Sequence, residues 1–414
     1  MTTGERGESV NYLSLWFYRY HTVHTYPSYR SKEKRSPQPR LPSLDRAPAL
    51  TLAILLLSSV TPKMDQRYLV IDSPHLLTVR DTDVYLKAAL EDIVANYPPR
   101  SRYPHDTLHG LCSGPTGMAY LLLHVSVLRP DVVISGQPAD HWARGYISPP
   151  SSRGHNLRLG SHGCGISDER LAYEAVRCAV SKDRQHVREF ISSVSQVMAV
   201  EDYPDEILYG RAGTLYLLRM VRHFVPGSND LVDPAIAEFS NTIMNRGPHW
   251  KWHGRRYLGA VHGDIGIVTQ LVLTSPSLAP RLQPIFERLL DMQLPDGNWP
   301  SSEGNGSSGK GLVQFCHGAP GFIVSLTALR PYFPEFRDRI DEAIKKGREC
   351  VWSQGLLKKE PCLCHGIFGN ALYVGPSCRP LMSTLPKLTT PEHCPMGRSE
   401  NISLPSPFLR TLRT

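Results

Sequence analysis

The pattern that decides the fold occurs twice, as Phe315-Cys316-His317-Gly318-Ala319-Pro320-Gly321 and as Leu363-Cys364-His365-Gly366-Ile367-Phe368-Gly369-Asn370. Each copy has a Cys-His pair, then two glycines three residues apart, then an apolar run. Thiolate and imidazole are preferred zinc ligands, at about 2.3 Å and about 2.0–2.1 Å from the metal. From the pattern alone two interpretations stay open: a zinc site shared by two distant turns, or two buried cysteines beside turn histidines.

The pair of glycines recurs at a spacing of roughly 50 residues, a period typical of repeated helical pairs. The earlier copies are Cys112-Ser113-Gly114-Pro115-Thr116-Gly117, a weaker His162-Gly163-Cys164-Gly165-Ile166, Tyr209-Gly210-Arg211-Ala212-Gly213 and Val261-His262-Gly263-Asp264-Ile265-Gly266. An apolar run follows each of them. The pattern therefore predicts that one supersecondary unit is repeated along the chain.

Amphipathic segments separate the copies, with apolar residues three and four positions apart and charged residues on the other face. They are 83–96, 184–197, 234–244, 279–293 and 335–352. A helix that is apolar on all sides is buried, and an amphipathic helix covers it. We therefore predict an all-α fold, an α/α toroid of two concentric helical layers, with every glycine turn at the same end.

The end that carries the turns is where we expect function. Glycine permits positive φ and close backbone approach, and each turn leaves unpaired N–H groups at the start of an inner helix. Helix N-termini that converge on one mouth favour anions and favour a thiolate over a thiol. Close helix packing would explain any single glycine pair, but it would not explain Cys and His beside the later ones.

The composition is that of a globular protein able to bury a core, since 41% of the 414 residues are hydrophobic and 20% are charged. Much of the net charge of +8 lies in the first forty residues and the last few, and charges alternate elsewhere. We therefore exclude nucleic acid as a partner. Nine cysteines, an odd number without a disulfide framework, predict a reduced, cytoplasmic protein.

Three parts are expected along the chain. Residues 1–63 lack periodicity, and we interpret them as a disordered extension, with a mitochondrial or secretory leader as the alternative. Their apolar run, 49–60, is shorter than the roughly 20 residues that span a bilayer, so membrane association is not expected. Residues 64–375 are predicted to form the helical domain, and 376–414 an irregular, proline-rich tail.

Five motifs in order resemble those of the lanthionine synthetase C-like (LanC-like) proteins, and the eukaryotic branch most closely. They are Leu208-Tyr209-Gly210-Arg211-Ala212-Gly213, Gly259-Ala260-Val261-His262-Gly263, Pro295-Asp296-Gly297-Asn298-Trp299-Pro300, Cys316-His317-Gly318-Ala319-Pro320-Gly321, and Gly355-Leu356-Leu357-Lys358-Lys359 leading to Cys364-His365-Gly366. The resemblance covers roughly residues 70–375. It implies an α/α barrel of about six to seven helical hairpins, in agreement with the repeat.

The resemblance also implies one zinc ion per chain, held by Cys316, Cys364 and His365. His317 is then a hydrogen-bonding neighbour rather than a ligand. Cys362 is interpreted as a bystander thiol, the alternative being a thiol that competes for the metal. Eukaryotic members of that family add the thiol of glutathione to dehydroalanine or dehydrobutyrine in damaged proteins. The resemblance therefore predicts glutathione as the co-substrate and a peptide or protein with dehydroamino acids as the partner.

Two further residues acquire roles from the resemblance. His262 matches a histidine that would give a proton to the enolate formed by thiol addition, the alternative being a histidine satisfied within its turn. Lys359 matches a lysine that would pair with a glutathione carboxylate, the alternative being an exposed lysine beside Lys358. Arg211 also lies on a turn, where it could face an anion. Together these features predict a zinc-dependent glutathione transferase that forms thioethers.

The sequence departs from the family pattern at two places. In the turn Cys164-Gly165-Ile166, isoleucine stands where the family pattern has an acidic residue. After Tyr373 there is no seventh glycine turn. The absence of the family's last hairpin from this pattern favours a second hypothesis. In it, the protein is not catalytic and binds glutathione or a partner through the same mouth. A truncated product without function is a third, and a glycosidase-like toroid a fourth. The fourth needs two carboxylates at the mouth, where the turns offer only Asp264.

Overall fold

The computed structural model describes residues 67–71, 76–79, 81–147, 158–160, 163–304, 311–373 and 402–405. The predicted extension, 1–63, lies outside these residues, and so does the predicted tail, 376–414, apart from strand β4 (Ile402–Pro405). His162, in the weaker copy of the glycine pattern, also lies outside them.

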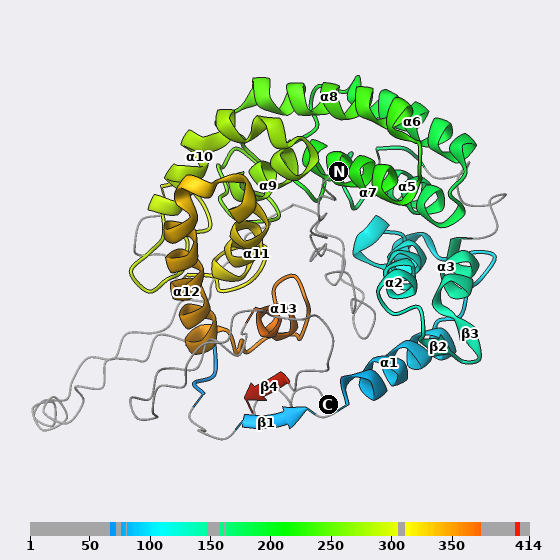
Figure 1. Ribbon diagram of the computed structural model, residues 1–414, viewed down its shortest axis with the longest axis horizontal. Helices are drawn as coiled ribbons and strands as arrows, with labels where there is room; N and C mark the ends of the chain where they lie inside the picture. The colour runs from blue at the N-terminus through cyan, green and yellow to red at the C-terminus, as the bar shows by residue number, and fades with distance from the viewer. Residues whose placement is uncertain are drawn as a thin grey trace, which may run out of the picture.

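Two layers of helices follow one another around an arc (Figure 1). The inner helices are α2 (Gly114–Leu128), α5 (Glu169–Ser181), α7 (Arg211–Phe224), α9 (Asp264–Thr274), α11 (Ala319–Leu329) and the short α13 (Ile367–Ala371). The outer helices are α3 (Ala139–Ile147), α6 (Arg184–Met198), α8 (Asn229–Arg246), α10 (Ala279–Asp291) and α12 (Arg337–Gln354). From α2 to α9, each inner helix contacts the next inner helix, and from α2 to α11 each contacts the outer helix that follows it in sequence. The predicted all-α, two-layered toroid is confirmed.

The remaining elements are short or lie at the margin of the two layers. Helix α1 (Thr82–Asn96) precedes the first inner helix. Strand β1 (Leu76–Val79) pairs with β4, and β2 (Val133–Ile134) pairs with β3 (Gln137–Pro138), both antiparallel. The 3₁₀ turns are η2 (His105–Thr107), η3 (Gly110–Cys112), η4 (Pro276–Leu278), η5 (Arg330–Tyr332) and η6 (Pro334–Phe336). No helix in the described ranges is both long enough and apolar enough to cross a membrane.

The periodicity of the sequence accounts for the two layers. In α9 only Leu273 is not fully buried, whereas α6 buries one face and exposes the other. The predicted amphipathic segments coincide with α1, α6, α8, α10 and α12. The main difference is in α8, which begins at Asn229 rather than at the predicted Pro234. The ring of this proline removes one backbone hydrogen bond, but the helix continues through it because Val232, before it, is already buried in the core.

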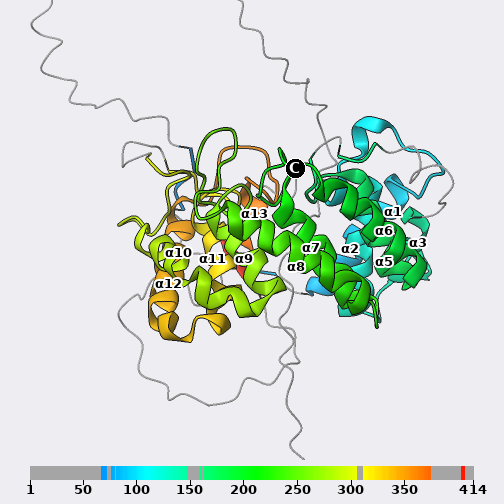
Figure 2. The same ribbon diagram turned by 90° about the horizontal axis from the view of Figure 1, so that it is seen from above.

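Neighbouring turns are joined through their backbones at one end of the inner layer. The bonds are Leu111 N–H to Ile166 O, Ile166 N–H to Ile207 O, Ile207 N–H to Val261 O, and Cys316 N–H to Cys364 O. Glycine makes this approach possible: a Cβ on Gly213 would press on Ile207 O and lie 2.7 Å from Gly165 Cα. The connecting loops gather along one edge of the molecule, above the helices (Figure 2). The turns therefore share one end, as predicted.

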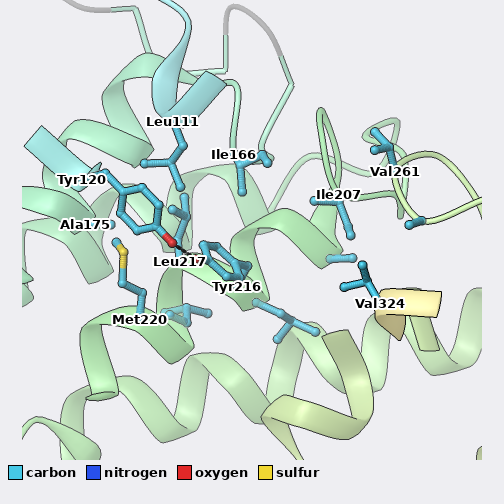
Figure 3. Packing of buried hydrophobic residues seen from close by; sticks show 14 of the residues in the cluster. Leu111, Tyr120, Ile166, Ala175, Ile207, Tyr216, Leu217, Met220, Val261 and Val324 are labelled. Carbon is cyan, nitrogen blue, oxygen red and sulfur yellow. Dashed lines mark hydrogen bonds between the residues drawn. The ribbon is translucent and has the colours of Figure 1, made fainter. Parts of the chain in front are cut away.

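Beneath the turns lies a continuous apolar core. The buried residues Leu111, Ile166, Ile207 and Val261 come from successive turns and lie along one side of it (Figure 3). Farther in, the hydroxyls of Tyr120 from α2 and Tyr216 from α7 form a buried hydrogen bond. The core thus holds the inner helices against one another directly beneath the turns.

We expect Gly213→Ala to lower the free energy of unfolding by at least about 2 kcal/mol, because the added methyl group would separate two hydrogen-bonded turns. Urea unfolding followed by circular dichroism measures this change. Gly254→Asn is the control, since nothing lies within 4 Å of a Cβ there and asparagine tolerates positive φ. A Gly213→Ala protein as stable as the control would contradict the role of close turn contact.

His124 provides a pH-dependent probe of the core. Burial, and secondarily the nearby His223, lower the pKa of His124 from 6.5 to about 4. The unfolded chain therefore takes up this proton near pH 6.5, and stability from neutral His124 is lost as the pH falls toward 4. We expect wild type to lose about 3 kcal/mol of its free energy of unfolding relative to His124→Leu as the pH falls over this interval. A stability difference between wild type and His124→Leu that does not change with pH would contradict the assignment.

Candidate metal centre

Two of the turns bring two thiols and one imidazole together. Cys316 precedes α11, Cys364 and His365 precede α13, and their ligand atoms all lie within 4.8 Å of one another. In a tetrahedral zinc site two thiolate sulfurs are about 3.8 Å apart, so only a small contraction would be needed. The donor set also fits, because thiolate and imidazole suit zinc better than they suit magnesium or calcium. These three residues could therefore hold a metal ion.

Buried amides hold the two turns in register. Asn298 accepts a hydrogen bond from Ala319 N–H at 2.8 Å and donates to Leu312 O at 3.3 Å. Gly318, with φ of 107°, is required between them, since a Cβ there would press on Leu312 O. Asn370 of α13 donates to Val313 O at 2.8 Å, on the segment that leads to Cys316. The ligands thus sit on a braced backbone rather than on free loops.

Hydrogen bonds within the cluster shift the pKa values of Cys316, Cys364 and His365. The hydrogen bond with Cys364 is the largest influence that holds the pKa of Cys316 well below its ordinary value. The same hydrogen bond raises the pKa of Cys364 well above its ordinary value. Hydrogen bonds with Cys316 and then Cys362 raise the pKa of His365 to about 9. A bound cation would take the place of these shared protons.

Cys362 lies beside the cluster but not within it. Its sulfur accepts a hydrogen bond from His365 N–H at 3.4 Å, and it is also hydrogen-bonded to the His365 imidazole. Burial acts to raise the pKa of Cys362, but these hydrogen bonds outweigh it and the pKa is lowered. The sequence left open whether this thiol competes for the metal, and the geometry gives it contact with a ligand rather than a place among the ligands.

Lys359 reaches the cluster through a second side chain. Its Nζ donates to Gln314 Oε1 at 2.7 Å, and Gln314 Nε2 donates to Cys316 Sγ at 3.0 Å. Lys359 is exposed and Gln314 is buried. Lys359, selected from the sequence as a substrate-binding residue, thus lies at the rim of the candidate metal centre.

His262 is paired with a carboxylate that sequence reasoning missed. Its Nδ1 lies 2.7 Å from Glu206 Oε2, and Glu206 also accepts backbone N–H groups from Leu208 and Tyr209. The carboxylate must accept from Nδ1–H, so Nε2 remains for other groups. The sequence feature that could have identified Glu206 is its position as an acidic residue just before the Leu208-Tyr209-Gly210 turn. Glu206 therefore places an acidic group beside His262.

Aromatic rings surround His262. Trp252 stacks on it with ring centroids 4.0 Å apart and planes 1° apart, and His317 lies 5.9 Å away. His317 is outside the metal-competent cluster, and burial lowers its pKa. Its Nδ1 is buried without a hydrogen-bond partner among the described residues. His262 is therefore adjacent to the residue that follows Cys316, on the same side of the molecule as the cluster.

Two other residues singled out in the sequence have structural partners. The buried Arg211 binds Asp205 and backbone carbonyls, including that of Val200 at 2.9 Å, so it does not face an anion at the mouth. Asp264 is fully buried and bound to Arg256 and Arg288, and burial raises its pKa to about 6. The carboxylate that a glycosidase would need is thus enclosed in an arginine network.

Comparison with known proteins identifies relatives. Residues 75–374 match the profile of the lanthionine synthetase C-like protein family. The zebrafish (Danio rerio) protein named Glutathione S-transferase LANCL1 is 29% identical over 312 residues, which cover 69% of this chain and 72% of that protein. The Arabidopsis thaliana LanC-like protein GCL1 is 32% identical over 180 residues, which cover 40% of each chain.

We expect purified protein to contain one equivalent of zinc, measured by inductively coupled plasma mass spectrometry. Cys316→Ala and Cys364→Ala should each lose it, because two ligands bind too weakly to retain the ion. Cys178→Ala, a buried thiol in α5, is the matched control and should keep the metal. Cys362→Ala should also keep it. Folded wild type without zinc, or loss of zinc in the control, would rule out this cluster.

Proposed function

The chain belongs to the lanthionine synthetase C-like family, and on that basis we propose that it adds the thiol of glutathione to dehydroalanine or dehydrobutyrine residues of proteins or peptides. The proposed cofactor is one zinc ion, held by Cys316, Cys364 and His365. Two observations carry the proposal. Two thiols and an imidazole from two turns lie together, and the ring of His262, which is paired with Glu206, lies 5.9 Å from the ring of His317, the residue that follows Cys316. The presence of seven free cysteines among the described residues supports a reducing compartment, the cytoplasm.

A zinc ion held by two thiolates and one neutral imidazole would stabilise the thiolate form of an incoming thiol, and the charge of its sulfur ligands would leave that thiolate nucleophilic. The sulfur then adds to Cβ of the dehydroamino acid. The electron pair of the C=C bond moves toward the carbonyl, and Cα of the enolate must gain one proton. The thiol proton lost at the start balances the proton gained at Cα.

His262 is the proposed donor of that proton. Glu206 accepts from its Nδ1–H, which directs the second ring nitrogen, Nε2, to the reacting atoms. Trp252 covers one face of the imidazole and excludes water from it. Glu206 is buried and fixed by backbone N–H groups, so it would act as a positioning residue that holds the ring. Lys359, exposed at the rim, is proposed to pair with a glutathione carboxylate.

We expect His262→Gln to lower kcat by about 10²–10⁴-fold, the usual contribution of a positioned general acid. Glu206→Gln should lower kcat in the same direction by a smaller factor. Zinc content and the KM for glutathione should change little in either variant. The assay follows the thioether product of glutathione and a dehydroalanine peptide by mass spectrometry, with zinc-loaded protein. His253→Asn is the control, because His253 adjoins Trp252 but has positive φ that asparagine tolerates.

Two results would count against the proposal. Full activity in His262→Gln would remove His262 as the proton donor. Zinc and glutathione binding by wild type without any thioether product would exclude the transferase and favour the non-catalytic binding protein.

A further inference from the structure

Gln314 connects the protein surface to a candidate metal ligand. Its side chain is buried, with 6% of the residue exposed, and lies between Lys359 Nζ at 2.7 Å and Cys316 Sγ at 3.0 Å. An ammonium group can only donate hydrogen bonds, so the amide oxygen must face Lys359. The amide nitrogen therefore faces the sulfur and donates to it. The orientation of this amide follows from the chemistry of its two neighbours.

The backbone holds Gln314 in this position. Gln314 N–H donates to His317 O, and His317 N–H donates to Gln314 O, both at 3.1 Å. These two bonds close a tight turn around Cys316, so a side chain at position 314 is directed toward the sulfur two residues later. The arrangement is part of the turn that carries the ligand, and it does not depend on a mobile loop.

We propose that Gln314 is a positioning residue for the metal centre, which sets how strongly Cys316 donates charge to a bound metal ion, and that Lys359 acts on the metal through it. The inference rests on the proposed function only in taking these residues as a zinc site. Neither the sequence patterns nor the relatives' names assign a role to Gln314.

The physical argument is one of polarisation along two hydrogen bonds. The N–H group of Gln314 stabilises negative charge on Cys316 Sγ, since hydrogen bonds to an ionised acceptor are stronger than neutral ones. The positive charge of Lys359 on the amide oxygen strengthens that donation. Groups that hold metal ligands in this way typically change metal affinity by about 10–100-fold when they are removed. The contribution of Lys359 is smaller because its ammonium is exposed to water.

The test measures metal binding by the full-length protein, without any glutathione reaction. Zn²⁺ affinity is obtained by competition with a chromophoric chelator, and Co²⁺ is bound in parallel to record the sulfur-to-cobalt charge-transfer band. Gln314→Leu removes both hydrogen bonds. Gln314→Glu keeps an acceptor for Lys359 but removes the donor to Cys316, so it separates loss of the N–H group from loss of packing. Lys359→Met has Lys358→Met as its matched control.

We expect Gln314→Leu and Gln314→Glu each to weaken Zn²⁺ binding by about 10-fold or more and to move the cobalt band to longer wavelength. Lys359→Met should weaken Zn²⁺ binding by about two- to fivefold, and Lys358→Met should have no effect. In the Gln314→Leu background, Lys359→Met should cause no further loss, because the lysine acts through the glutamine.

Wild-type Zn²⁺ affinity and an unshifted cobalt band in Gln314→Glu would overturn the inference. So would an equal effect of Lys359→Met with and without Gln314. Either result would leave the proposed thiol addition intact if the wild type forms thioether. Conversely, the expected metal-binding results in a protein that forms no thioether would support the role of Gln314 and contradict the proposed function.

Discussion

The contact between neighbouring glycine turns is the constraint on which the rest of the structure depends. Because the turns hydrogen-bond to each other through their backbones, a side chain at the contact point has no room, as at Gly213. The same contacts place the start of every inner helix at one end of the toroid. Residues that are distant in sequence, such as Cys316 and Cys364, become neighbours through this row of turns.

The candidate metal centre is a consequence of that row of turns. One backbone bond, from Cys316 N–H to Cys364 O, joins the two turns that carry the three metal-competent side chains. Asn298 and Asn370 brace the segments on either side, so the ligand geometry is set by buried amides and not by the metal alone. The His262–Glu206 pair comes from two other turns, and it joins the same end of the molecule for the same reason.

The sequence predicted the helices and the repeat well, because helical periodicity and glycine turns are local signals. The Cys-His pairs were also visible, although only the resemblance to a family selected Cys316, Cys364 and His365 over His317. Glu206 and Gln314 were not found, since their importance depends on neighbours 56 and 45 residues away in the chain. Arg211 shows the opposite case: its position on a turn left anion binding open, and the fold encloses it among carbonyl groups and Asp205.

The central claim is that two turns hold one metal ion with an open position for a thiol. X-ray absorption spectroscopy of the zinc-loaded protein tests it most directly, because sulfur ligands at about 2.3 Å are distinguished from nitrogen and oxygen ligands at about 2.0–2.1 Å. The account predicts two sulfur ligands in the protein alone and three after glutathione is added. Three sulfurs before glutathione, which would mean that Cys362 closes the site, or no change on adding it, would contradict the account.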